Sequence, residues 1–295
     1  MALTLAIAPV AARADDQVTL GWGRLFDNDA LGDMHDRWHT GSYAVSLMRG
    51  TAWSGALPDR FGQLLEYRLR ADSVAPANFA HPALSDRRYA GSISFGVHSQ
   101  AEWQGTEVNL GADLVAIGPQ TGLSGFQAAI HDAVGMDKPN TSNQIGNAYR
   151  PNLSGELGRS IAIADGVTLR PYLAAEAGVE TLVRAGGDLV IGHFGDRSVM
   201  LRDEVTGQRY RAVAGTLTNG MSVTLGGDLA RVFASTYLPD GGLAILGDTR
   251  TRLRAGVQWQ GSLGSVFYGV TYLSPEFKGQ TAGQLVGSLN VNMRF

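Results

Sequence analysis

Residues 106–114 read Thr-Glu-Val-Asn-Leu-Gly-Ala-Asp-Leu, and this stretch decides the fold class. Polar or small residues at positions 107, 109, 111 and 113 alternate with apolar residues at 108, 110, 112 and 114. Successive side chains of a β-strand point to opposite faces, so the stretch predicts a strand with one polar and one apolar face. The same two-residue period is clear in three more stretches, at 65–70, 252–259 and 285–295.

Weaker alternation marks further candidate strands, which lie near residues 17–24, 40–49, 88–98, 150–163, 167–179, 180–193, 210–216, 221–234 and 263–273. Most have the roughly 9–11 residues that a tilted strand needs to cross a bilayer. Turn signals such as Asp165-Gly166 separate them. We therefore expect an all-β fold, an antiparallel transmembrane β-barrel of about 12 strands, with residues 15–295 as a single domain.

A soluble β-sandwich would show the same alternation, so other features must separate the two classes. The polar faces carry charges of both signs, among them Glu66 and Arg68. A barrel would place such charges in its lumen, where arginine and carboxylate groups can pair. Aromatic residues such as Trp22 and Trp103 recur near strand ends, as in the girdles of membrane barrels. The final Phe295, at the end of an alternating strand, is typical of bacterial outer-membrane barrels.

The composition excludes several functional classes. The chain has 24 basic and 27 acidic residues, a net charge of −3, so we expect no nucleic-acid partner. The absence of cysteine excludes disulfide scaffolds, thiol catalysis and cysteine-ligated metals. Glycine occurs 39 times in 295 residues, about twice its usual share of ~7%. That excess suits a barrel with bent strands and frequent turns.

The first residues have the features of a secretory signal peptide. An apolar run over residues 3–12 is followed by Ala12-Arg13-Ala14, a small-x-small cleavage pattern. We interpret residues 1–14 as the remaining part of a signal peptide and expect the protein to be exported. No other run approaches the roughly 18 apolar residues of a membrane helix, so any membrane span must be built from strands.

Residues 117–138 break the β pattern and predict a short helix that ends at Gly135. On that helix Gln127 and His131 lie four residues apart and share one side. A histidine there could act as a general base, because its ordinary pKa of about 6.5 suits proton abstraction near neutral pH. From spacing alone, a solvent-exposed loop histidine is the alternative interpretation.

A second polar cluster occurs early in the chain, at residues 26–29 and 36–41. Its carboxylates, amide and hydroxyl are hard oxygen ligands of the kind that calcium binds. A polar loop with side-chain turns is the alternative. The chain has no Gly-x-Ser-x-Gly, His-Glu-x-x-His or Walker motif.

A set of short motifs runs in order along nearly the whole chain. They are Asn28-Asp29, Asp36-Arg37 with Thr40-Gly41, Asp86-Arg87-Arg88-Tyr89-Ala90-Gly91, Ile117-Gly118-Pro119, Phe126-Gln127 with His131 and Gly135, Gln144-Ile145 with Asn147 and Tyr149, and Ser274-Pro275-Glu276-Phe277. With these motifs the chain resembles the outer-membrane lipid A 3′-O-deacylase family. The resemblance implies a monomeric twelve-stranded barrel in the outer membrane of a Gram-negative bacterium. It also implies calcium-dependent removal of the 3′-linked acyloxyacyl group from lipid A, the lipopolysaccharide anchor in the outer leaflet.

The resemblance also implies roles for individual residues. His131 would activate a water molecule, and Gln127 would orient the histidine or the substrate. Asn28, Asp29 and Thr40 would lie in the active site and help to bind Ca²⁺.

Two positions depart from the family pattern. The family has a glutamate shortly after the histidine, where this chain offers Asp137 as a further calcium ligand. The family also has a lysine in the loop after the third strand, but residues 72–87 contain none. Arg87, Arg88 and His81 are the candidates to bind the lipid phosphate instead. A phospholipid esterase on the same barrel and a non-catalytic channel or structural barrel are the alternative functions.

Overall fold

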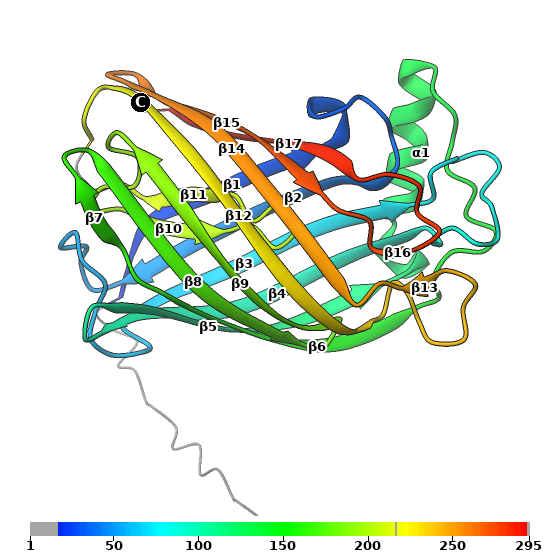
Figure 1. The fold of residues 1–295 in the computed structure, drawn as a ribbon, viewed down its shortest axis with the longest axis horizontal. Coiled ribbons are helices and arrows are strands. Elements are labelled where there is room, and N and C mark those ends of the chain that lie inside the picture. The colour runs from blue at the N-terminus through cyan, green and yellow to red at the C-terminus, as the bar shows by residue number, and fades with distance from the viewer. Residues whose placement is uncertain (1–16, 216, 294–295) are drawn as a thin grey trace, which may run out of the picture.

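A computed structural model describes residues 17–215 and 217–293, which form a closed antiparallel β-barrel with one short helix (Figure 1). The predicted signal peptide at residues 1–14 and the terminal Phe295 lie outside the described residues. Twelve strands form the wall: β1 (Val18–Asn28), β2 (Trp38–Gly50), β3 (Leu64–Ala75), β4 (Ala90–Trp103), β5 (Thr106–Ile117), β6 (Ala148–Gly158), β8 (Val167–Ala177), β9 (Glu180–Ile191), β12 (Gly220–Ser235), β14 (Thr249–Gly261), β15 (Gly264–Leu273) and β17 (Gln284–Met293). Neighbouring strands pair in this order, and the β1–β17 and β6–β8 pairings complete the ring.

The remaining elements lie in the connections. They are the 3-10 turns η2 (Asp29–Leu31) and η3 (Pro119–Thr121), the helix α1 (Leu123–Val134), and the short strands β7 (Ile161–Ala164), β10 (Val199–Arg202), β11 (Arg209–Val213), β13 (Ile245–Leu246) and β16 (Phe277–Lys278). Within the described part of the chain, no helix is both long and apolar enough to cross a bilayer.

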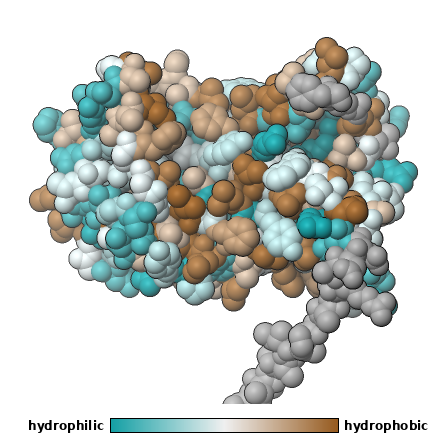
Figure 2. All heavy atoms as spheres, turned by 180° about the vertical axis from the view of Figure 1, so that it is seen from behind, coloured by the Kyte–Doolittle hydropathy of each residue, from teal (hydrophilic) through white to brown (hydrophobic). Residues whose placement is uncertain are grey.

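The wall has the two faces that the sequence predicts. On β14, Leu253 and Trp259 are 57% and 52% exposed, whereas Arg252 and Arg254 are each only 5% exposed. Apolar side chains therefore face outward and charged ones face the lumen, as a barrel in lipid requires. Figure 2 shows apolar residues over the middle of the visible wall, with more hydrophilic residues at the end drawn on the left.

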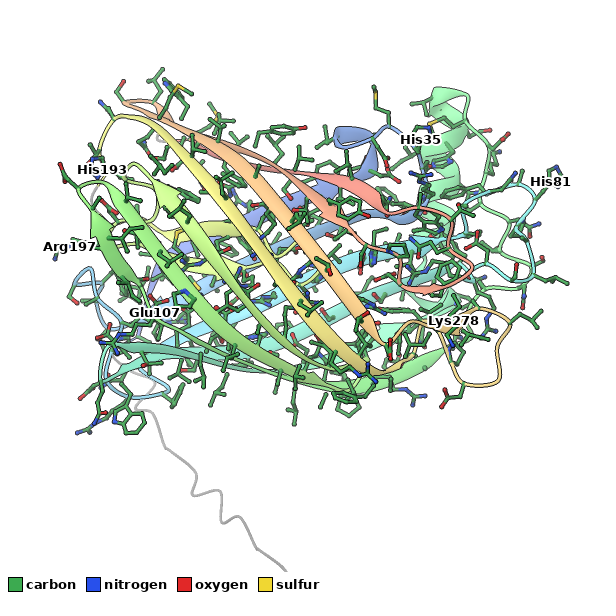
Figure 3. The ribbon with its side chains drawn as sticks, viewed as in Figure 1. His35, His81, Glu107, His193, Arg197 and Lys278 are labelled. Carbon is green, nitrogen blue, oxygen red and sulfur yellow. The ribbon has the colours of Figure 1, made fainter. Side chains whose placement is uncertain are left out.

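The two ends of the barrel differ, and we name them by what they carry. The loop end carries α1, η2, β13 and β16 (Figure 1). The opposite end is called the hairpin end, because the β10–β11 hairpin joins the wall there. In Figure 3, His35, His81 and Lys278 mark the loop end, and His193 and Arg197 mark the hairpin end.

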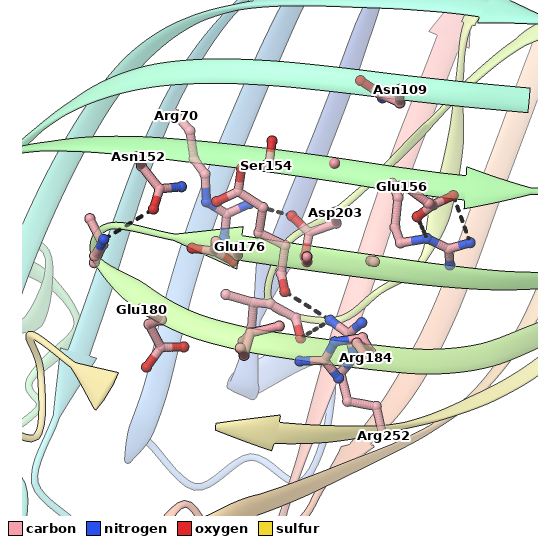
Figure 4. A pocket seen from close by; sticks show the side chains of 18 of the residues that line it. Arg70, Asn109, Asn152, Ser154, Glu156, Glu176, Glu180, Arg184, Asp203 and Arg252 are labelled. Atoms are coloured by element: carbon pink, nitrogen blue, oxygen red, sulfur yellow. Dashed lines mark hydrogen bonds and ion pairs between the residues drawn. The ribbon is translucent and has the colours of Figure 1, made fainter. Parts of the chain in front are cut away.

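Charged side chains inside the lumen satisfy one another. Asp228 accepts hydrogen bonds from three arginines, which are Arg184, Arg252 and Arg254. A single unpaired charge at such a buried position would cost several kcal/mol, so the network is stable only while it is complete. A cavity of about 200 Å³ remains among these side chains, and its lining extends from the loop end to the hairpin end (Figure 4).

Some wall glycines make room for charged side chains in the lumen. A Cβ atom at Gly96 would lie 1.9 Å from Oδ1 of Asp113, and one at Gly111 would lie 2.0 Å from Nδ1 of His98. His98 and Asp113 form a buried pair with 3.1 Å between Nε2 and Oδ1. Part of the glycine excess is therefore explained by lumen packing, in addition to strand bending and turns.

The interpretation of residues 210–216 as a wall strand was wrong. Residues 209–213 form β11, which pairs only with β10 in a hairpin that lies inside the lumen. Tyr210 and Val213 join Leu25 and Leu201 in an apolar cluster at the hairpin end, so both faces of β11 are buried. Alternation alone could not separate this hairpin from the wall.

Charges also attach the hairpin to the wall. Asp203, in its turn, accepts a hydrogen bond from Arg70 of β3 (Figure 4). Glu204 lies 3.2 Å from the guanidinium of Arg68 on the same strand. The hairpin is thus fixed in the lumen by an apolar cluster at its base and by ion pairs at its tip.

Candidate active site

The loop end brings together the five catalytic residues that the sequence predicts. Asn28 is the last residue of β1, Asp29 opens η2, and Thr40 lies near the start of β2. Gln127 and His131 lie on α1, which stands beside these loops (Figure 1). The helix ends at Gly135 as predicted. A chain of contacts, described below, connects all five residues.

His131 is the buried residue of α1 and is held at both ring nitrogens. Nδ1 lies 2.5 Å from the backbone carbonyl oxygen of Asp137, and Nε2 lies 2.9 Å from Oδ2 of Asp36. A carbonyl can only accept, so Nδ1 carries a hydrogen and Nε2 is the basic nitrogen. The ring of Phe79 packs against the imidazole with 5.3 Å between centroids. His131 is therefore oriented for proton transfer at Nε2.

Asp36 is a site residue that the sequence reasoning did not assign. It is part of the Asp36-Arg37 motif, but its contact with His131 of α1 forms because two segments far apart in the sequence lie close together in the fold. Its side chain also forms a hydrogen bond with Asp29, and burial raises its pKa above the ordinary 3.8, an effect that the charge of His131 opposes. The Asp36-Arg37 motif was the available sequence signal for this residue, and it did not indicate a role for the side chain.

Asp29 is 2% exposed and accepts a hydrogen bond of 3.0 Å from the backbone N–H of Arg37. Burial raises the pKa of Asp29 to about 8, and the nearby negative charge of Asp36 adds to the shift. Two adjacent carboxylates of this kind are costly to ionise together, unless a cation or a shared proton offsets their repulsion. When both carboxyl groups are ionised, the Asp29–Asp36 pair is therefore a local excess of negative charge beside His131.

Thr40 and Tyr89 fix the side chain of Gln127. The Nε2 group of Gln127 donates to Oγ1 of Thr40 at 3.3 Å, and its Oε1 accepts from the Tyr89 hydroxyl at 3.0 Å. Thr40 is the extra residue of a β-bulge, because the β2–β3 register pairs His39 with Val74 and then skips to Gly41. Bulges commonly redirect a side chain near a functional site, and this one gives Thr40 its place under α1.

Asn28 completes the group of five. Its amide nitrogen donates to the carbonyl of Thr40 at 2.7 Å, and its Oδ1 accepts from the backbone N–H of Ala30 at 2.8 Å. Asn28 therefore joins the end of β1 to the bulge and caps η2.

The predicted calcium ligands Asn28, Asp29 and Thr40, together with Asp36, which was not predicted as a ligand, fit a hard cation in their chemistry. Asp29 and Asp36 offer carboxylates, and Asn28 and Thr40 offer neutral oxygens close by. Asp137 contacts the site through its backbone carbonyl, while its side chain is exposed. Within residues 17–215 and 217–293, no three histidine or acidic side chains are already gathered in a metal-holding group.

The predicted phosphate-binding residues do not share one environment. Arg87 is 2% exposed and donates a 2.5 Å hydrogen bond to Glu276, and it lines the lumen cavity. Arg88 is half-buried. His81 is exposed at the edge of the loop end (Figure 3), and its backbone N–H donates to Asn78 at 2.8 Å.

Comparison with known proteins settles the family. A family model described as outer membrane protein LpxR matches residues 1–295. The chain belongs to the LpxR family. The resemblance to the outer-membrane lipid A deacylases is therefore confirmed, and the chain is an outer-membrane protein of a Gram-negative bacterium.

One solved structure shares the fold of this barrel. LpxR from Salmonella typhimurium superposes with a TM-score of 0.76 at 18% identity, over 93% of this chain and 100% of that one. The β domain of the Bordetella autotransporter BrkA gives a TM-score of 0.46 at 12% identity, over 95% of this chain and 100% of the other. A comparison with curated protein sequences gives no match. The prediction of a twelve-stranded antiparallel barrel with one short helix is confirmed.

Proposed function

We propose that the protein is a calcium-dependent ester hydrolase of the outer membrane that removes the 3′-linked acyloxyacyl group of lipid A. The observation that carries this proposal is the pairing of His131 with Asp36 beside Asp29 at the loop end of an LpxR-family barrel. The loop end also carries the longest connection of the wall, residues 118–147. Long loops of bacterial barrels face the exterior, which would place the site beside the outer leaflet.

His131 is the proposed general base. With its Nδ1 hydrogen bonded to the Asp137 carbonyl, Nε2 can accept a proton from water once Asp36 releases it. The negative charge of the adjacent Asp36 carboxylate then stabilises the imidazolium that forms. Water attacks the ester carbonyl directly, so no acyl-enzyme forms, and the imidazolium returns the proton to the departing sugar oxygen.

Gln127 and the calcium ligands support this chemistry. The amide of Gln127 is fixed at both ends, and it can orient the ester or the water beside His131. Asp29 and Asp36, with neutral oxygens of Asn28 and Thr40, would hold Ca²⁺. The ion, when bound, would polarise the ester carbonyl and stabilise its developing negative charge. One chain supplies the whole ring and every residue named here, so we propose that it acts as a monomer.

A channel function is disfavoured by the lumen. The β10–β11 hairpin and the buried ion pairs fill the interior, and a cavity of about 200 Å³ remains. A water-filled channel of the porin kind needs a much wider barrel. The hydrolase proposal is therefore tested first.

The decisive experiment is mass spectrometry of lipid A treated with the purified protein in detergent with Ca²⁺. We expect loss of the 3′-acyloxyacyl group with the wild type and with H193A, a control histidine at the hairpin end. We expect no loss with H131A or after calcium chelation. Phospholipid hydrolysis with intact lipid A would overturn the substrate assignment. Full activity of a folded H131A would overturn the mechanism.

A further inference from the structure

Glu276 lies in the Ser274-Pro275-Glu276-Phe277 motif, and the mechanism above does not use it. It is 6% exposed in the loop between β15 and β16. Its Oε2 accepts from Nη1 of Arg87 at 2.5 Å, and its Oε1 lies 3.2 Å from Nε2 of His39 and 3.1 Å from Nη1 of Arg250. One buried carboxylate therefore joins the start of β2, the end of the loop between β3 and β4, and the start of β14.

The first connection leads through His39 to Thr40. The segment before the bulge is held from both sides, because the Gln284 amide accepts from the His39 N–H at 3.0 Å and donates to the His39 carbonyl at 3.1 Å. Glu276 fixes the imidazole of the same residue. The next residue in the chain is Thr40, whose hydroxyl accepts from the Nε2 group of Gln127.

The second connection leads through Arg87 to Tyr89. Arg87 is buried, and Glu276 is the carboxylate that its guanidinium contacts. Two residues later, Tyr89 is held at its carbonyl by the N–H of Ile145 at 2.8 Å, and its hydroxyl donates to Oε1 of Gln127. Both connections thus end on the same amide, one on its nitrogen and the other on its oxygen.

We propose that Glu276 is a positioning residue that fixes the orientation of Gln127 and, through α1, that of His131. The inference rests on the proposed hydrolase function. If Glu276 loses its charge, buried Arg87 and His39 lose their common partner, and both hydrogen bonds to Gln127 lose their support. Arg250 differs, because it keeps two hydrogen bonds of 2.6 and 2.9 Å to Glu180.

This difference supplies a matched control. The variants E276Q and E180Q each neutralise a carboxylate of the same network. Among the described residues, Glu180 forms no hydrogen bond or ion pair with His39 or Arg87. With lipid A as substrate, we expect E276Q to lower kcat at least tenfold with KM within twofold of the wild type. We expect E180Q to stay within twofold for both constants. Equal kcat values for E276Q and E180Q would overturn the proposal.

A double-mutant cycle tests the route through Gln127. If Glu276 acts through that amide, E276Q lowers kcat less than threefold in a Q127A background. A further tenfold loss would show that Glu276 acts elsewhere, and would overturn the proposal. If E276Q does not fold into a barrel, R87Q and H39Q each remove one connection. Each should then lower kcat at least threefold, and wild-type kcat in both would overturn the inference.

Hydrogen exchange separates this inference from the proposed function. Peptides that cover residues 123–134 should exchange faster in E276Q than in E180Q, measured by mass spectrometry in detergent micelles. Equal exchange would overturn the positioning role. If the wild-type protein hydrolyses no lipid A, the proposed function fails, while the exchange comparison still decides whether Glu276 orders α1.

Discussion

The two ends of this barrel are closed by different balances of apolar and polar interactions. At the hairpin end, Leu201, Tyr210 and Val213 pack against Leu25 and Met48 in an apolar cluster like the core of a soluble domain. The loop end also has small apolar clusters, such as the one formed by Ala75, Phe79 and Tyr89. Its connections are joined in addition by hydrogen bonds and ion pairs among buried or partly buried polar side chains, with Glu276 and Asp36 among the centres. The cluster at the hairpin end depends on apolar burial, whereas the loop end depends on ionisation as well as on burial.

The difference shows how one chain can combine stability with chemistry. Apolar packing has no directional requirement and does not depend on the ionisation of its side chains, so the cluster at the hairpin end is insensitive to pH. A polar network fixes donors and acceptors in direction, which catalysis needs, but it fails when one partner is lost. Changes at the hairpin end should therefore affect stability, and changes at the loop end should affect activity.

The largest effect is expected for Asp36→Asn. An amide cannot stabilise the imidazolium of His131, so lipid A hydrolysis should fall by about 10²–10⁴-fold. The unfolding midpoint in detergent should stay close to that of the wild type, since the hairpin end is unchanged. An Asp196→Asn variant, at an exposed carboxylate beside His193, is the control and should retain full activity. A hydrolysis rate for Asp36→Asn within threefold of the wild type would contradict the role of the pair.

The second largest effect is expected for Leu201→Ala. Leu201 is fully buried in the apolar cluster, so its truncation should lower the free energy of unfolding by about 2–5 kcal/mol. Activity per folded molecule should not change. The same truncation at Leu253, which faces outward, leaves no cavity and should cost less. Urea unfolding in micelles measures both variants, and equal losses would contradict the picture of a closed hairpin end.

The smallest effect is expected at the loop end when the pH is lowered. Arg250, His39 and Arg87 hold the pKa of Glu276 well below its ordinary 4.5, although burial alone would raise it. A depressed carboxyl pKa stabilises the fold above the unfolded value, and that contribution is lost as pH falls through the folded value. The protection factor for hydrogen exchange near residues 37–40, which corrects for the pH dependence of intrinsic exchange, should therefore stay constant from pH 7 to about 4.5 and fall below that pH. The E276Q variant should show no such step, and a step of equal size there would assign it to another group.

The sequence predicted the wall well, because alternation is a local property of each strand. It also predicted the helix with Gln127 and His131, whose spacing is local too. The hairpin was missed since Tyr210 and its neighbours resemble a strand, and no local signal says which side of the wall it occupies. Asp36 and Glu276 were not given roles because their contacts are long-range: Glu276 and Arg87 are 189 residues apart.

The bulge at Thr40 makes the site sensitive to chain length as well as to residue identity. One extra residue between His39 and Gly41 sets the pairing of β2 with β3. Deleting a single residue there would restore unbroken pairing and move the preceding residues to the opposite face of the wall. An insertion or deletion in these few residues would therefore be more damaging than most substitutions. Related barrels that carry the same site should therefore keep the length of this strand.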